Sequence, residues 1–315
     1  MTSTSAFEQG YQFLDAAHAA LSDGYAGAVV ELGRRLHEYR PQLGPQWPEF
    51  ARSHCARHPV REKIHESPFT RRCYQQPRGY PGDPVILDYI FGHNSLEGVS
   101  DLGRALYERE RYQTSCRSVR ARRDLLAAKV DETARRVRKP RVLSVACGHL
   151  REAQKSEAVA GGEIGEYLAL DQDAESLAVV DREQRSRGVR TVCATVRSLL
   201  TGKAITGQTG LDRPFDFVYT AGLYDYLKDA VATRLTSVLF DMLRPGGRLL
   251  VGNFHAECPD AASMEAILTW WLVYRDERQM SQLCSEIDPA QVAESSIYRD
   301  ELRNLVFLEL VRGDA

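Results

Sequence analysis

The feature that most constrains the fold is a unit of strand, turn, helix, strand and acid between residues 141 and 171. A basic segment ends at Pro140, and the apolar-rich stretch 142–145 that follows is short enough for a buried strand. The small residues 146–148 predict a turn, and the residues after it predict the start of a helix. A second apolar run ends at Asp171, 23 residues after Gly148. This order is typical of the beginning of a doubly wound parallel sheet.

Asp171 suggests which ligand such a sheet would bind. A carboxylate at the end of the second strand accepts hydrogen bonds from the hydroxyl groups of a ribose; the alternative is that Asp171 only caps the next helix. A dinucleotide needs a glycine-rich turn that lets the backbone approach a pyrophosphate. Here residues 149–151 are His, Leu and Arg, which would crowd a diphosphate. The sequence therefore favours an adenosine compound without phosphate, S-adenosylmethionine.

Strand and helix patterns continue to alternate as far as residue 254. They predict a helix ending near Gly188, strands at 190–194, 213–220 and 248–254, and a helix at 230–243. Such alternation is typical of a parallel sheet with helices on both faces. Two short runs at 296–298 and 304–311 then predict an antiparallel hairpin at the edge. The predicted fold class is α/β, with a Rossmann-like sheet and a C-terminal antiparallel hairpin.

The N-terminal third has helical rather than alternating periodicity. Residues 7–39 predict two helices separated near Gly24 and Gly27, with Pro41, Pro45 and Pro48 ending the second. We expect a helical appendage with a lid loop over residues 1–100, and the sheet domain over 101–315. The lid is the stretch 68–83, whose prolines and glycines predict a rigid loop; a packed interdomain linker is the alternative.

Composition narrows the class of partner. A hydrophobic fraction of 43% and a net charge of −2 are those of a globular protein without the basic excess expected of a nucleic-acid binder. The arginine-rich stretch 101–141 has interleaved acids, which favours a solvated helix face over a nucleic-acid surface. No apolar run is long enough to enter a membrane, and seven scattered cysteines favour reduced thiols in the cytoplasm. His54, Cys55 and His58 lack a repeated ligand spacing, so no metal is predicted. The oligomeric state is left open.

Further blocks carry a resemblance to a known family. The Phe215-Asp216 strand and the turn Pro245-Gly246-Gly247 are similar to those of class I S-adenosylmethionine-dependent methyltransferases. More narrowly, the chain from about residue 60 onward resembles bacterial proteins assigned to synthesis of the 3-hydroxypalmitic acid methyl ester signal, or extracellular factor. The blocks that carry this resemblance are 77–83, 144–148, 222–227, 252–255 and 271–275. It implies methyl transfer to a small metabolite, on a carboxylate or hydroxyl oxygen, in secondary or signal metabolism.

The chain departs from the general methyltransferase pattern at the first turn. Ser144 replaces the acid that normally reaches the cofactor's amino group, and Ala146 and Leu150 replace glycines. Residues of the lid loop are therefore candidates for the methionine end of the cofactor, since a guanidinium binds a carboxylate bidentately. The full set of predicted cofactor-binding residues is Arg78, Tyr80, Asp83, Ser144, Ala146, Cys147, Gly148, Asp171, Gln172, Val196, Arg197, Thr220 and Ala221.

Catalytic candidates follow the fourth and fifth strands, at the rim where such sheets bind ligands. His255 is the first choice for a base or a substrate hydrogen-bonding group. Tyr224 and Tyr226 are predicted to face the sulfonium, with plain packing as the alternative. A helix is expected at 264–274, with its apolar face packing in the core rather than forming a substrate wall. The predicted substrate-binding residues are Asn253, His255, Trp271, Tyr274 and Arg275.

Two other classes of function stay open. One is transfer of the aminocarboxypropyl arm of the same cofactor, or cyclisation, with methylthioadenosine as the product. The other is a non-catalytic cofactor-binding scaffold. For a methyltransferase, the acceptor decides whether a base is needed, because a carboxylate is already ionised at neutral pH.

Overall fold

The computed structural model describes residues 3–314, which form two compact units. Unit 1 contains the chain up to Arg120 together with Glu257–Trp271. Unit 2 contains Ala121–Ala256 and the chain from Leu272 onward. Residues 101–120 and 257–271, which the sequence analysis placed in the sheet domain, therefore belong to the helical unit.

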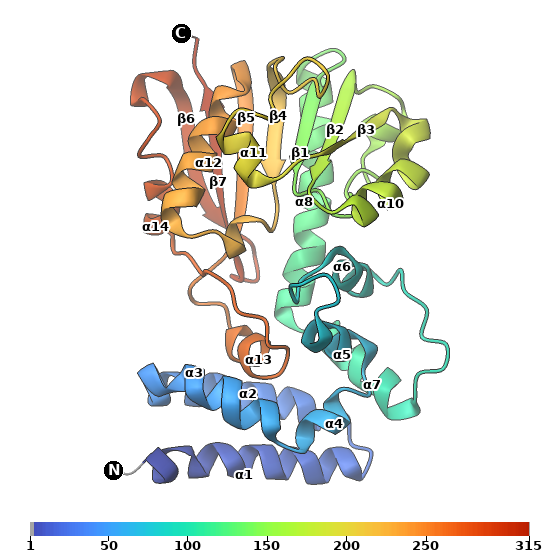
Figure 1. Cartoon of the computed structure of the whole chain (residues 1–315), viewed down its shortest axis with the longest axis vertical. Helices are drawn as coiled ribbons and strands as arrows, with labels where there is room; N and C mark the ends of the chain where they lie inside the picture. Colours follow the sequence, from blue (N-terminus) through green and yellow to red (C-terminus); the bar gives the residue numbers. More distant parts are fainter. Residues whose placement is uncertain (1–2, 315) are drawn as a thin grey trace. The chain divides into compact units, whose positions relative to one another are not determined.

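Unit 2 is built on a seven-stranded sheet in the order β3-β2-β1-β4-β5-β7-β6 (Figure 1). The neighbours among β1 to β5 pair in parallel, whereas β7 pairs antiparallel with both β5 and β6. This confirms the predicted Rossmann-like α/β sheet with a C-terminal antiparallel hairpin. The strands are β1 (Arg141–Val145), β2 (Glu166–Asp171), β3 (Val189–Cys193), β4 (Phe215–Thr220), β5 (Leu243–Phe254), β6 (Val292–Arg299) and β7 (Leu305–Arg312).

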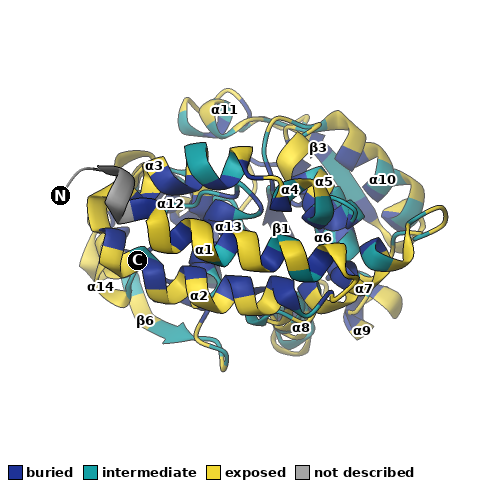
Figure 2. Cartoon of the chain, turned by 90° about the horizontal axis from the view of Figure 1, so that it is seen from below, coloured by how far each residue is buried: buried dark blue, intermediate teal, exposed yellow. Residues whose placement is uncertain are grey.

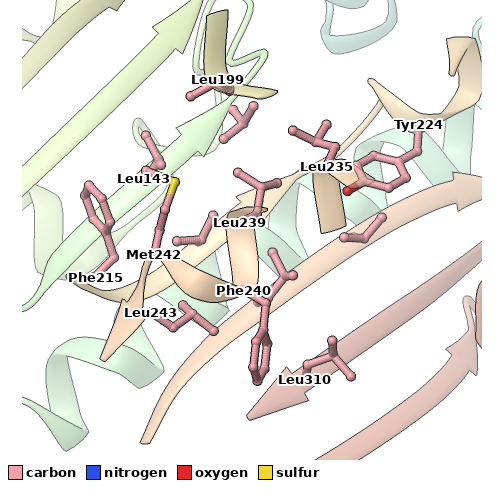
Figure 3. Close-up of a cluster of buried hydrophobic side chains, with 14 of the residues drawn as sticks. Leu143, Leu199, Phe215, Tyr224, Leu235, Leu239, Phe240, Met242, Leu243 and Leu310 are labelled. Atoms are coloured by element: carbon pink, nitrogen blue, oxygen red, sulfur yellow. The ribbon is translucent and has the colours of Figure 1, made fainter. Parts of the chain in front are cut away.

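Helices cover both faces of this sheet. Helix α8 (Thr114–Arg136) enters unit 2 at residue 121, and its Lys129 pairs with Glu309 of β7 at 2.8 Å. Leu308 and Leu310, the neighbours of Glu309 in β7, point to the opposite face. There they share a core with Leu235 and Leu239 of α12 (Asp229–Asp241). Figure 3 shows Leu310 together with these two α12 residues. The remaining helices of unit 2 are α9 (Glu157–Ala160), α10 (Ala174–Gln184), α11 (Val196–Leu200) and α14 (Glu277–Gln282).

Two turns in unit 2 differ from the prediction. The helix expected directly after Gly148 does not form; the described backbone from 146 to 156 makes successive turns instead. Ala146, Gly148 and Leu150 have φ of 54°, 54° and 50°, a left-handed conformation that cannot continue a right-handed helix. The turn at 245–247 lies inside β5, where the ladder with β4 steps from Phe215–Leu243 to Phe217–Arg248. The extra residues bulge out of the ladder.

Unit 1 is helical, as predicted. Helices α1 and α2 have buried residues along one side and exposed residues along the other (Figure 2). The segment 257–271 belongs to this unit because buried Glu265 accepts hydrogen bonds from Trp47 Nε1 (2.6 Å) and Arg40 Nη2 (2.9 Å). The helices are α1 (Ser3–Ser22), α2 (Ala28–Leu43), α3 (Trp47–Glu49), α4 (Val60–Ile64), α5 (Pro68–Gln75), α6 (Pro84–Phe91), α7 (Asp101–Glu110) and α13 (Ala261–Ala266), with a π-helical turn at Phe50–His54.

Three local predictions in unit 1 were wrong. Pro41 lies within α2, which ends at Leu43. The first half of the lid loop is helix α5, because Pro68 occupies the first helical position, where its missing N–H has no partner to lose. The helix expected at 264–274 stops at Ala266, and Thr269 has a φ of 52°. The packing interpretation nevertheless holds for the unit 1 part of that stretch, in which Met264 and Leu268 are buried and Ile267 and Trp271 pack against the core.

Candidate functional site

The carboxyl end of β2 is hydrogen-bonded to the turn that follows β1. Asp171, the last residue of β2, accepts a hydrogen bond on Oδ2 from Gly148 N (2.9 Å) and one on Oδ1 from Asp173 N (3.0 Å). Burial raises the pKa of Asp171, and these backbone N–H groups oppose the rise. The backbone N–H of Gln172 lowers the pKa as well. Since the two oxygens of a carboxylate together have four lone pairs, acceptor capacity remains for a ligand hydroxyl. Asp171 is not the cap of α10, because that cap is Asp173, whose side chain accepts from Glu175 N.

In the described structure, no helix begins directly after the turn that follows β1. A pyrophosphate is normally held by the N–H groups and dipole at the start of a helix. In the described residues that follow β1, the first helix is α9, which begins at Glu157. Cys147 N donates to Leu170 O (3.0 Å), which ties the turn to β2. The arrangement suits a neutral ribose better than a diphosphate.

A buried polar network lies beside the same turn. Glu152 accepts a hydrogen bond from Tyr219 Oη (2.6 Å), and Tyr219 Oη also contacts Tyr167 Oη at 2.5 Å. Ser144 shares a hydrogen bond with Tyr219 as well, so its side chain is used within the sheet. Burial raises the pKa of Glu152, while the hydrogen bond from Tyr219 lowers it. An acid is therefore present near the site after all, at Glu152 instead of at Ser144.

Two buried charged residues lie near the carboxyl end of β4: Asp225, which the sequence places after this strand beside Tyr224 and Tyr226, and Arg122, which was wrongly interpreted as part of a solvated helix face. Arg122 of α8 is 7% exposed and donates a hydrogen bond from Nη1 to Ala221 O. Asp225 accepts on Oδ1 from Phe254 N (2.6 Å), and burial raises its pKa to about 7 although Arg122 lowers it. The adjacent Thr220 is also buried, and among the described residues its Oγ1 has no hydrogen-bond partner. The available signal was that Arg122 lies on the same face of helix α8 as the apolar residues of that helix.

The remaining predicted cofactor residues fall into two groups. Gln172 and Arg197 are exposed, and Val196 is half-buried at the start of α11, so these three follow β2 and β3 at the same edge of the sheet as Asp171. Arg78 and Tyr80 belong to unit 1 and are half-buried.

Asp83, also in unit 1, is fully buried in a structural role. Its side chain caps α6 by accepting from Val85 N and Ile86 N at 3.0 Å, and it pairs with Arg72 at 2.7 Å. We therefore leave Asp83 out of the candidate site.

Two predicted substrate residues are fully engaged within the protein. Arg275 is completely buried and donates all five N–H groups, to Asp229 Oδ1 from Nε and Nη2, to the carbonyls of Tyr224 and Leu227, and to Asn253 Oδ1. Asn253 donates its amide hydrogens to the carbonyls of Phe254 and Val273. Neither side chain has a donor left for a substrate. Both hold the segment 272–275 against the loop that follows β4.

The aromatic candidates are dispersed. The ring of Tyr224 lies in the core beneath α12, with Oη 2.9 Å from Thr236 Oγ1, so for Tyr224 the packing alternative is correct (Figure 3). Tyr226 is 38% exposed. Trp271 is in unit 1, where Cζ of Arg52 lies 4.3 Å from the centroid of its ring. Tyr274 is half-buried in unit 2.

His255 directly follows β5 and is 2% exposed. Its Nε2 lies 3.1 Å from Glu277 Oε2, and its backbone N–H donates to Asn304 O (2.7 Å). A histidine held by a carboxylate in this way is the arrangement expected of an oriented base.

No group of three or more His, Cys, Asp and Glu side chains among the described residues could hold a metal ion. No helix in the described part of the chain is long and apolar enough to cross a membrane.

Solved structures that resemble this chain share its fold at low sequence identity. A possible exported protein from Bordetella parapertussis matches with a TM-score of 0.54 and 17% identity, over 82% of this chain and 99% of that chain. The N-methyltransferase NodS from Bradyrhizobium japonicum, in complex with S-adenosyl-L-homocysteine, matches with a TM-score of 0.44 and 14% identity, over 62% and 88%. Magnesium protoporphyrin IX methyltransferase from Synechocystis, with its cofactor bound, matches with a TM-score of 0.45 and 10% identity, over 78% and 97%. No family model and no curated protein matches. At such identities the likeness shows the fold alone.

Proposed function

We propose that the protein is an S-adenosylmethionine-dependent methyltransferase acting on a small metabolite. The observation that carries the proposal is the carboxylate of Asp171, fixed by Gly148 N beside a turn that does not start a helix. This geometry supports binding of a ribose and disfavours a pyrophosphate. When bound, the cofactor supplies a methyl group already activated by a sulfonium.

The residues of the chain would mainly orient the reaction. In-line displacement needs the acceptor atom, the methyl carbon and the sulfur in one line, and orientation of that kind lowers a barrier by several kcal/mol. Asp171 would hold the ribose. His255, which directly follows β5, is the candidate for a base or for a group that hydrogen-bonds the acceptor. We keep Gly148, Ala146, Cys147, Gln172, Val196, Arg197, Thr220 and Ala221 in the proposed cofactor site, and His255, Tyr226 and Tyr274 in the proposed acceptor site.

The proposed acceptor atom is a carboxylate or hydroxyl oxygen of a metabolite from secondary or signal metabolism. The resemblance of the motif blocks to methyl-ester-forming proteins supports this choice. The seven cysteines are all free in the structure, which supports placement in the reducing cytoplasm.

Two measurements test this function. Calorimetry with S-adenosylhomocysteine and with NAD should show binding of the first and not of the second. Purified protein should then be incubated with S-adenosylmethionine and candidate acceptors, and the nucleoside product identified by mass. S-Adenosylhomocysteine would establish methyl transfer, methylthioadenosine would establish transfer or cyclisation of the longer arm, and cofactor binding without either product would establish a scaffold.

A further inference from the structure

Arg122 is a buried charge without an ionic partner. Its guanidinium is 7% exposed, and in the described structure its one hydrogen bond is donated to Ala221 O. No ion pair of Arg122 is found among the described residues. Burying an unpaired guanidinium is costly, so buried arginines are normally paired with a carboxylate. Burial lowers the pKa of Arg122, which reflects that cost, and Asp225 and Glu152 are the main carboxylates that oppose the effect.

The two carboxyl groups that act most strongly on the pKa of Arg122 are themselves buried, and each accepts a hydrogen bond from another group. Asp225 accepts from Phe254 N and Glu152 accepts from Tyr219 Oη. Burial raises the pKa of both acids, and Arg122 lowers it in both. One buried cation and two buried acids thus influence one another without forming an ion pair. A ligand that carries both an ammonium and a carboxylate would complete this set of charges.

Gly222 keeps the space beside the guanidinium free of a side chain. A Cβ added at Gly222 would lie 3.7 and 3.8 Å from the two Nη atoms of Arg122 and 4.0 Å from Asp225 Oδ2. These are ordinary van der Waals distances, so a larger residue would contact both charged groups. Gly222 therefore places no side chain between the loop that follows β4 and the guanidinium.

The position of Arg122 relative to Asp171 sets the length of the ligand. Glu152 follows β1 and Ala221 follows β4, and β1 lies between β2 and β4 in the sheet. Adjacent strands are about 4.8 Å apart, so the ends of β2 and β4 are separated by roughly 10 Å. That separation matches a ribose joined to the extended amino-acid arm of S-adenosylmethionine.

We propose that Arg122 binds the α-carboxylate of S-adenosylmethionine, with Glu152 and Asp225 available to its α-ammonium group. The inference rests on the proposed function and deepens it, because it assigns the methionine end of the cofactor to α8 and the β4 loop. A guanidinium binds a carboxylate through paired charge-assisted hydrogen bonds, which an ammonium side chain cannot reproduce.

The test compares two ligands that differ only at the arm. S-Adenosylhomocysteine carries the amino-acid group, whereas methylthioadenosine has the same nucleoside and sulfur without it. The affinity of Arg122→Met for S-adenosylhomocysteine should fall about 10- to 150-fold, the value of charge-assisted hydrogen bonds, with unchanged affinity for methylthioadenosine. Arg122→Lys should lie between wild type and Arg122→Met.

The matched control is Arg135→Met, an exposed arginine of the same helix, which should bind both ligands like wild type. Unchanged methylthioadenosine binding also shows that the Arg122 variants are folded. Equal affinities of wild type and Arg122→Met for S-adenosylhomocysteine would overturn the inference, and a raised KM for the acceptor in that case would assign Arg122 to the acceptor instead. Loss of both ligands in folded Arg122→Met would also overturn it. Wild-type protein that binds neither ligand would refute the proposed function itself.

Discussion

The Oδ2 atom of Asp171 accepts a 2.9 Å hydrogen bond from the backbone N–H of Gly148, 23 residues earlier in the chain. The contact joins the end of β2 to the turn after β1, two elements that are neighbours in the sheet. One carboxylate therefore fixes the turn and offers its remaining lone pairs to a ligand. Under the proposed function, binding of the ribose would depend on the same side chain that orders the turn.

Replacing Asp171 by Ala should weaken binding of S-adenosylhomocysteine by about 2–4 kcal/mol, through loss of two charge-assisted hydrogen bonds to the ribose. The matched control is Asp173→Ala, which removes the cap of α10 at a cost of about 1 kcal/mol in stability but keeps the backbone N–H that contacts Asp171. Calorimetry should show near wild-type affinity for the control. An Asp171→Ala protein with unchanged affinity would remove Asp171 from the site.

The sheet could be predicted from the sequence because its signals are local and repeated. Each short apolar run from 142 to 254 ends at polar or small residues, and the break in rhythm near residue 296 marks the hairpin. Asp171 was identified for the same reason, since it ends such a run. The helix predicted after Gly148 does not form, because Leu150 has a positive φ that its residue type does not suggest.

For the charged residues of the candidate site, the sequence could not distinguish ligand-binding side chains from structural ones. Arg122 belongs to an arginine-rich helix that was interpreted as solvated, and only the fold shows that its side chain is buried near Ala221. Arg275 and Asn253 were predicted to bind substrate from their places in two motif blocks. The structure shows that both side chains instead bind backbone carbonyls of unit 2. A motif block marks such residues without distinguishing a ligand contact from a structural one.

Arg275→Met should destabilise unit 2 by about 3–5 kcal/mol, because the change strands buried acceptors that the guanidinium now satisfies. These acceptors are the carbonyls of Tyr224 and Leu227 and Oδ1 of Asn253. Chemical denaturation measures the loss. Arg278→Met, an exposed position on the following helix, should stay within about 0.5 kcal/mol of wild type. A stable Arg275→Met protein with a raised acceptor KM would return Arg275 to the substrate site.

Glu110 should make unit 1 less stable as the pH rises. It is buried, accepts hydrogen bonds from Ser67 and Thr70 at 2.5 Å, and burial raises its pKa to about 7 from an ordinary value of 4.5. A group with a raised folded-state pKa contributes stability that is complete below the unfolded-state pKa and is lost as pH rises through the folded-state pKa. The loss between pH 4.5 and 8 should approach about 3 kcal/mol.

Glu110→Gln cannot ionise, so it should show a smaller decline in stability over that pH range than wild type. Denaturant unfolding at the two pH values measures the difference. Glu108→Gln, a more exposed position on the same helix, should follow wild type. If Glu110→Gln and wild type lose stability in parallel, Glu110 is not the titrating group.

The pH dependence of turnover should reveal the type of acceptor atom. A carboxylate acceptor is ionised at neutral pH and needs no base, so His255→Ala should then reduce kcat only modestly, through lost positioning. The backbone N–H of His255 keeps its bond to Asn304 O in that variant, and the loop should remain in place. We expect this outcome, in keeping with the resemblance to methyl-ester-forming proteins. A hydroxyl or ammonium acceptor would make the same change cost 10²–10⁴-fold.

Asp225 must be tested in parallel, because its pKa of about 7 lies close to the pH at which a histidine ordinarily titrates, about 6.5. The wild-type rate, measured with saturating cofactor, should show no fall below about pH 6.5 if the acceptor is a carboxylate. A fall that persists in Asp225→Asn but disappears in His255→Ala would establish His255 as a general base and a protonated acceptor. A fall that disappears in Asp225→Asn instead would assign the titration to Asp225.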